Sequence, residues 1–192
     1  MTIGVLALQG AFRSHLAALQ RLGIVGKEVR TIDDLADVDA LIMPGGESTT
    51  MSMLLESSGL FDAIDARLDE GMPVFGTCAG LILLATDIED GRPDQRSFAR
   101  LDIDVQRNGY GRQIESFETD LDTTIFPGEP VHAVFIRAPR VVRVGTGVEV
   151  LAADRNDDPV LIRSGSVLAA AFHPELSDDD RIHRYFVEMI AY

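Results

Sequence analysis

Residues 74–85 read VFGTCAGLILLA, in which two apolar runs meet at the segment Gly76-Thr77-Cys78-Ala79-Gly80. The first run predicts a buried strand, and the second predicts a helix. The glycines between them mark a tight turn. A strand that turns directly into a helix is the repeating unit of parallel α/β sheets, so this stretch indicates the fold class.

Two earlier stretches show the same order of elements. Residues 3–8 predict a buried strand, and a helical apolar pattern follows over 12–22. Residues 40–43 predict another strand, which stops at a proline and two glycines before a helix that Ser48 and Thr49 are expected to cap. Repeated strand–helix order indicates a doubly wound parallel sheet.

The second half of the chain is predicted to be mostly strand. A charged loop rich in glycine and proline occupies 87–97, and β-branched runs follow at 103–105, 131–136, 141–144, 148–152, 160–162 and 167–172. A final amphipathic helix is expected to have Ser177 as its N-cap and Asp180 as the capping-box partner. Residues 1–192 therefore predict a single-domain α/β fold, a three-layer doubly wound mostly parallel sheet with additional strands in the second half.

Composition and charge exclude several classes of function. The chain of 192 residues is 46% hydrophobic, which suits a packed core rather than intrinsic disorder. Its 17 basic and 31 acidic residues give a net charge of −14, which argues against nucleic acid and membrane surfaces as partners. Arginine far outnumbers lysine, and aspartate outnumbers glutamate. This bias fits either genomic base composition or adaptation to high salt.

Cysteine usage and the N-terminal sequence predict a cytoplasmic, metal-free protein. A single cysteine cannot form an intramolecular disulfide, and neither a CxxC pair nor an H-E-x-x-H helix is present to bind zinc. The apolar N-terminus lacks the basic region and cleavage site of a signal peptide. The longest nearly apolar stretch, 74–85, is shorter than the ~20 residues that span a bilayer.

The glycine-framed turn has the spacing of a G-x-S-x-G nucleophile elbow, with Cys78 in the place of serine. Glycines allow the sharp turn that exposes the sulfur, and the N-terminus of the following helix directs amide groups toward it. This position favours the thiolate form of the side chain. A small buried cysteine is the ordinary alternative, but the glycine frame favours a nucleophile.

A cysteine nucleophile needs a base, and the four histidines differ in their positions. His15 and His183 fall inside predicted helices, where we expect solvated faces, and His132 begins a strand. His173 instead closes an apolar strand, at the edge where ligands bind in open α/β sheets. Glu175 lies two residues further on, on the same side of an extended segment. Together with the elbow cysteine, these two residues suggest a Cys-His-Glu triad.

Residues 44–49, PGGEST, also lie between a predicted strand and a predicted helix. Their glycines leave backbone N–H groups free to face an anion, although a plain turn explains them equally well. The segment lacks the lysine of a P-loop, and no other glycine pair has the setting of a dinucleotide fingerprint. Nucleotide binding is therefore discarded, and no cofactor is predicted.

These motifs together resemble a known class of enzyme. PGGES, GTCAG and FHPE, in this order, are similar to the class I glutamine amidotransferases, which have a flavodoxin-like fold and a Cys-His-Glu triad. Further blocks resemble one branch, the glutaminase subunits of pyridoxal 5'-phosphate synthase, or PdxT family. These blocks are LQGA at 8–11, PGGESTTM at 44–51, FGTCAGLI at 75–82, RN at 107–108, GRQ at 111–113, SFE at 116–118, FIRAP at 135–139 and FHPEL at 172–176.

The resemblance implies that the chain hydrolyses L-glutamine to L-glutamate and ammonia, and that a separate synthase subunit uses the ammonia to make pyridoxal 5'-phosphate. It implies that Cys78 is the nucleophile, that His173 is the acid and base, and that Glu175 holds the imidazole. The implied oxyanion hole consists of the amides of Gly46 and Ala79. The implied L-glutamine contacts are Gly46, Glu47, Ser48, Arg107, Ile136 and Arg137.

Three alternatives stay open at this point. A glutaminase that serves another synthase, or a γ-glutamyl hydrolase, shares the triad chemistry, but the GRQ and SFE blocks favour the PdxT branch. A non-catalytic subunit is expected to have lost part of the triad, whereas all three residues are present. A different class of cysteine protein has histidine directly after the elbow cysteine, where this chain has Ala79.

Overall fold

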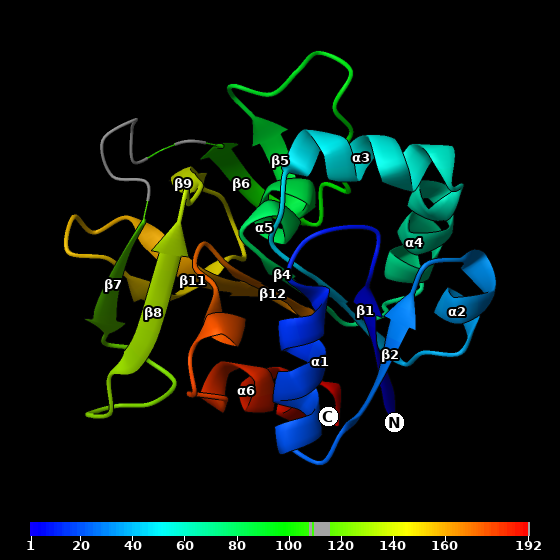
Figure 1. The fold of residues 1–192 in the computed structure, drawn as a ribbon. Coiled ribbons are helices and arrows are strands. Elements are labelled where there is room, and N and C mark those ends of the chain that lie inside the picture. The colour runs from blue at the N-terminus through cyan, green and yellow to red at the C-terminus, as the bar shows by residue number, and fades with distance from the viewer. Residues whose placement is uncertain (108, 110–115, 192) are drawn as a thin grey trace.

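The computed structural model describes residues 1–107, 109 and 116–191. Its main sheet has seven strands in the order β10-β11-β12-β4-β3-β1-β2 (Figure 1). In chain order these strands are β1 (Thr2–Leu6), β2 (Val25–Val29), β3 (Ala40–Met43), β4 (Val74–Thr77), β10 (Glu149–Ala153), β11 (Pro159–Ser164) and β12 (Val167–Ala170). The five strands from β12 to β2 pair in parallel, whereas β10 and β11 pair antiparallel.

Two smaller sheets come from the middle of the chain. One consists of β5 (Ala85–Ile88), β6 (Leu101–Gln106) and β9 (Arg140–Val144), and the other of β7 (Ser116–Leu121) and β8 (Val131–Ile136). The predicted mostly parallel sheet with additional strands in the second half of the chain is therefore confirmed.

Helices cover both faces of the main sheet. They are α1 (Phe12–Arg21), α2 (Ile32–Ala36), α3 (Ser48–Ser57), α4 (Leu60–Asp69), α5 (Ala79–Leu84) and α6 (Arg181–Ile190), with a 3-10 turn, η1 (Pro174–Leu176), before α6. On the central strand β4, the Phe75 ring contacts His15 of α1 and Phe186 of α6, whereas Gly76 faces α5. Figure 1 shows α1 and α6 together on one side, so the predicted three layers are confirmed. No helix in the described ranges has the length and hydropathy needed to cross a membrane.

Helix caps depart from the sequence-based expectation. The N-cap of α3 is Glu47 rather than Ser48 or Thr49. The Glu47 side chain is long enough for its carboxylate to accept the backbone N–H groups of Thr49 and Thr50 in the first turn. Ser177 ends η1 and does not cap α6, which begins after Asp180. Ser177 instead closes the turn that Pro174 begins, so the helix starts three residues later than expected.

Besides η1, four short elements were not predicted from the sequence: β2, α2, β5 and β7. The strand β2 lies at the edge of the main sheet, and much of it is exposed, so its sequence lacks a continuous apolar run. The helix α2 has only five residues, too few to show a helical period. The GRQ block at 111–113 and Asn108 lie outside the described residues.

The packing of α5 onto β3 predicts that Gly80→Ala destabilises the fold. A Cβ atom at Gly80 would lie 2.2 Å from the backbone oxygen of Met43, which cannot move without displacing a central strand. We expect a loss of about 3 kcal/mol or more in the free energy of unfolding, measured with urea. Gly23→Ala is the control, because its Cβ meets open space and only the left-handed backbone costs about 1 kcal/mol. Equal losses in the two variants contradict the packing argument.

Candidate functional site

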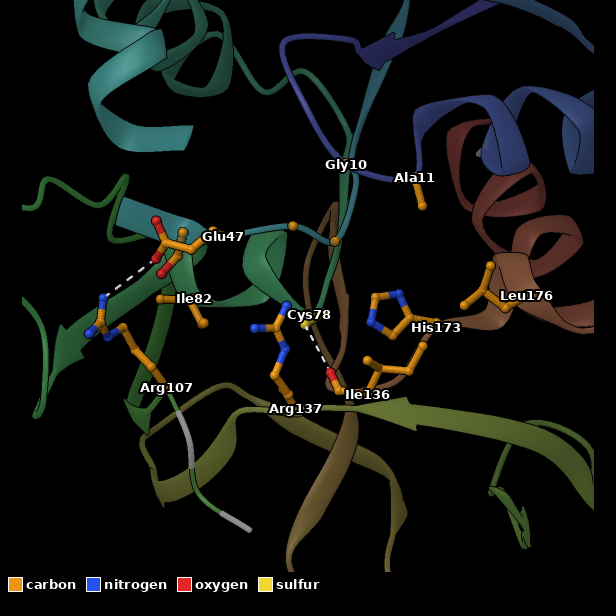
Figure 2. A pocket seen from close by; sticks show the side chains of 13 residues that line it. Gly10, Ala11, Glu47, Cys78, Ile82, Arg107, Ile136, Arg137, His173 and Leu176 are labelled. Atoms are coloured by element: carbon orange, nitrogen blue, oxygen red, sulfur yellow. Dashed lines mark hydrogen bonds and ion pairs between the residues drawn. The ribbon is translucent and has the colours of Figure 1, made fainter. Parts of the chain in front are cut away.

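A pocket of about 430 Å³ opens where β3 and β4 end, at the carboxyl edge of the parallel sheet. Segments far apart in the sequence contribute its walls, as Figure 2 shows. The lining residues are Gly10, Ala11, Gly45, Gly46, Glu47, Ser48, Cys78, Ile82, Arg107, Ile136, Arg137, His173 and Leu176. Eight of the ten residues predicted from the sequence therefore meet here. Of the other two, Ala79 follows Cys78 in the chain, and Glu175 binds His173 from behind.

Cys78 occupies a strained turn between β4 and α5. Its backbone has φ 49° and ψ −101°, a region that non-glycine residues rarely adopt. The Cys78 N–H donates to the carbonyl of Ala170 in β12 at 2.8 Å, and Sγ lies 4.0 Å from the carbonyl oxygen of Ile136. The side chain is largely buried but lines the pocket, as the predicted nucleophile elbow requires.

The turn that ends β3 approaches the cysteine and the histidine closely. A Cβ atom at Gly45 would lie 2.3 Å from His173 Cε1 and 3.3 Å from Cys78 Cβ, so only glycine fits at this position. The Gly45 carbonyl accepts the Ala11 N–H at 3.3 Å. Because C=O and N–H point in opposite directions across a trans peptide, the Gly46 N–H points away from Ala11.

His173 and Glu175 form a buried hydrogen-bonded pair. His173 Nδ1 lies 2.8 Å from Glu175 Oε1, and the His173 backbone N–H donates to Val134 of β8. Burial lowers the pKa of His173, but the neighbouring Cys78 side chain and the hydrogen-bonded Glu175 carboxylate raise the pKa to about 10. The ring is therefore an imidazolium at neutral pH, held between the thiol and the carboxylate.

The carboxylate of Glu175 stays ionised although it is buried. Burial raises its pKa, but interactions with His15 and His173 outweigh burial, so the pKa lies below its usual value. An ionised carboxylate only accepts hydrogen bonds, so His173 Nδ1 is the donor in this pair. The proton on Nδ1 leaves Nε2 as the ring nitrogen available to exchange protons in the pocket.

The expectation of solvated helix faces for His15 and His183 is wrong. Both side chains are fully buried between α1, α6 and β4, with His15 Nδ1 2.9 Å from His183 Nε2. His15 Nε2 lies 3.2 Å from Thr77 Oγ1 and 3.5 Å from Glu175 Oε2. The contacts among these side chains satisfy most of their polar atoms, although His183 Nδ1 and Glu175 Oε2 have no hydrogen bond from a described residue. The sequence did contain an indication that His15 is buried, because His15 falls on the apolar helical stripe that includes Phe12 and Leu19.

The charged residues of the pocket differ in how firmly they are held. The Glu47 carboxylate caps α3 and also accepts the Thr50 hydroxyl. The Arg107 guanidinium donates to Thr49 and lies 3.8 Å from Glu47. Among the residues that the structure describes, Arg137 has no hydrogen bond or ion pair, and its backbone has φ 44°. In Figure 2 its side chain extends into the pocket, where its charge is available to an anion.

Within the described ranges, no group of three or more His, Cys, Asp or Glu side chains is arranged to hold a metal ion. The polar groups of the pocket are instead a thiol, an imidazolium backed by a carboxylate, backbone amides and two arginines. Such a set can form and hydrolyse an acyl thioester on a ligand that carries a carboxylate.

Comparisons with known proteins agree on one family. The profile of the SNO glutamine amidotransferase family matches residues 5–192. A curated relative from Frankia alni, named pyridoxal 5'-phosphate synthase subunit PdxT, is 53% identical over 188 residues, which are 98% of this chain and 94% of the relative. A crystal structure titled glutamine amidotransferase is 52% identical, with a TM-score of 0.92 and 99% of both chains covered. The PurLQS structure from Thermotoga maritima, 16% identical with a TM-score of 0.71 over 97% of each chain, is similar in fold alone.

The thiol–imidazolium pair predicts a reactive cysteine that depends on His173. We expect iodoacetamide to alkylate the single cysteine of the folded chain at pH 7, and His173→Ala to slow alkylation about tenfold or more, because the sulfur loses the cationic side chain beside it. Mass spectrometry of timed samples gives the rates. In urea both chains should react equally fast. Equal rates in the folded state contradict the pairing.

Proposed function

This chain belongs to the SNO glutamine amidotransferase family, and from that premise we propose that it is the glutaminase subunit of a pyridoxal 5'-phosphate synthase. It hydrolyses L-glutamine to L-glutamate and ammonia and delivers the ammonia to a synthase subunit. The observation that carries the proposal is the strained Cys78 turn beside an imidazolium that Glu175 holds. The proposal treats residues 1–192 as one glutaminase domain that works in the cytoplasm, where a lone thiol stays reduced.

In the first half of the reaction, the Cys78 thiolate attacks the side-chain amide carbon of L-glutamine. A tetrahedral oxyanion forms, and the backbone amides of Gly46 and Ala79 donate to it. His173, already an imidazolium, gives its Nε2 proton to the amide nitrogen. The carbon–nitrogen bond breaks, ammonia leaves, and a γ-glutamyl thioester remains on the sulfur.

In the second half, neutral His173 accepts a proton from water while the water oxygen attacks the thioester carbonyl. The second tetrahedral intermediate collapses to L-glutamate and the thiolate, and His173 is again an imidazolium. Glu175 keeps the ring in one orientation and one tautomer through both steps. Its burial supports this role, because a carboxylate without competing water holds the ring more strongly.

The charged residues of the pocket hold the amino-acid end of the substrate in this proposal. Arg137 binds the α-carboxylate, because a guanidinium pairs with a carboxylate through two parallel hydrogen bonds and this one has no described partner. Glu47 faces the α-ammonium together with Ser48, and the Ile136 carbonyl adds an acceptor close to the sulfur. Arg107 supports this end by holding Thr49 and by its charge near Glu47.

The Gly45–Gly46 peptide is the proposed point at which the synthase controls the enzyme. Two glycines impose no side-chain barrier to rotation of this peptide, and one hydrogen bond of 3.3 Å from Ala11 sets its present orientation. A peptide turned the wrong way places a carbonyl where the oxyanion forms. Loss of one oxyanion donor costs about 10²–10³ in rate, so a partner that fixes this turn switches the enzyme on.

The function is tested by measuring ammonia release from L-glutamine and formation of pyridoxal 5'-phosphate. The chain with its synthase should be at least about 100-fold faster than the chain alone. Cys78→Ala should still bind the synthase but release no ammonia, because the covalent acceptor is gone. Turnover by Cys78→Ala contradicts the mechanism. Equal rates with and without the synthase reject the control by the Gly45–Gly46 peptide and leave the glutaminase assignment standing.

The substrate contacts predict a specific effect on KM. Arg137→Ala should weaken L-glutamine binding by about 1.5–3 kcal/mol, because a charge-assisted pair with the α-carboxylate is lost. Steady-state kinetics with saturating synthase measure the change. Arg155→Ala is the matched control, since Arg155 is exposed and does not line the pocket. If both variants raise KM equally, the assignment of Arg137 is wrong.

A further inference from the structure

Two buried histidines have no part in the mechanism above, yet they lie directly behind it. We propose that His15 is a positioning residue that holds the second oxygen of Glu175, and that His183 fixes the tautomer in which His15 does so. The catalytic consequence of this arrangement rests on the proposed glutaminase function, whereas the arrangement itself is a property of the isolated chain.

The two oxygens of Glu175 have different surroundings. Oε1 accepts from His173 Nδ1 at 2.8 Å. Oε2 is buried and has no hydrogen bond from any described residue, and His15 Nε2 lies 3.5 Å from it. A buried carboxylate oxygen without a donor is costly, so His15 supplies the stabilisation that Oε2 otherwise lacks.

The positions of the protons follow from these contacts. If His15 carried its proton on Nδ1, the lone pair of Nε2 would face the negative oxygen of Glu175. With the proton on Nε2, His15 donates toward Glu175 and the Thr77 hydroxyl, and its Nδ1 accepts from His183 Nε2 at 2.9 Å. The buried Nδ1 of His183, which has no described hydrogen-bond partner, is then an acceptor rather than an orphaned N–H.

Burial leaves both histidines neutral. Burial lowers the pKa of His15, and the Glu175 charge only partly offsets it. Burial also lowers the pKa of His183 to about 3. His15 and Arg21 of α1 act in the same direction as burial, whereas Glu175 and Asp180 oppose it. The other titratable groups facing this cluster are His173 and, beyond it, Cys78. A neutral ring donates from one nitrogen only, so His183 donates to His15 and His15 donates toward Glu175. Glu175 also accepts from His173, so the donors on both sides converge on the carboxylate.

The catalytic value of this chain lies in the position of the carboxylate. A carboxylate held at one oxygen can rotate about its last bond, which would swing Oε1 away from His173. Contacts at both oxygens fix the plane of the group and keep it ionised, and an ionised Glu175 in turn favours the imidazolium form of His173. Loss of His15 should therefore change the pKa of His173, although the two rings do not share a hydrogen bond.

Nitrogen-15 NMR of the isolated chain tests the arrangement directly, because the protein has only four histidines. Long-range proton–nitrogen spectra across a pH titration should show His15 neutral with its proton on Nε2. His15→Leu should lower the pKa of His173 by about half a unit or more, since Glu175, then held at one oxygen only, can rotate away from the His173 ring. His15→Gln, whose amide nitrogen reaches the position of Nε2, should restore most of that shift.

Phe186→Leu is the matched structural control. Phe186 packs on the same Phe75 ring as the two histidines, but its side chain carries no polar atom. It should lower stability without moving the titration of His173. In the complex with synthase, His15→Leu should lower kcat about tenfold with KM unchanged, and Phe186→Leu should not.

Two results would overturn the proposal: an Nδ1 proton on His15, or a His173 titration that is the same in His15→Leu and the wild-type chain. If the wild-type complex releases no ammonia, the glutaminase assignment fails, and the NMR titration still decides the role of His15.

Discussion

The positive φ of Cys78 is sustained by contacts on both sides of the turn. Its N–H bonds to Ala170 in β12, and its carbonyl accepts the N–H of Ile82 in the first turn of α5. These bonds are main-chain bonds within the buried centre of the sheet, so the turn cannot relax without disrupting β4 and its neighbour. The position of the sulfur is therefore set by the backbone, and Gly45 and His173 are placed around it.

Much of this arrangement was predictable from the sequence. The strands β1, β3, β4 and β12 lie in apolar runs that stop at Gln9, Pro44, Gly76 and His173, which is typical of buried parallel strands with a site at their carboxyl ends. The edge strand β2 and the short hairpin strand β7 carry charged side chains and depend on tertiary pairing. Their sequences alone contain too little periodicity to show them.

The roles of individual polar residues were harder to predict. Histidine within a helix usually indicates a solvated face, and only the three-dimensional meeting of α1 with α6 pairs His15 with His183. The family motif likewise implies that Glu47 and Arg107 contact the substrate. In the structure Glu47 also caps α3, and Arg107 also donates a hydrogen bond to Thr49. A sequence motif indicates only one role for each residue. A second role, such as capping a helix, becomes visible only in the three-dimensional structure.

The place of β12 in the sheet has a consequence for how the protein is made. Residues 167–170 form β12, which lies between β4 and β11. This strand and His173, which follows it, come about 90 residues after Cys78 in the sequence. A nascent chain that has left the ribosome as far as α5 already contains the elbow cysteine but neither the strand that braces it nor the base that activates it. The Cys78 turn therefore gains its supporting strand and its base only after β12 has been made and has paired with β4.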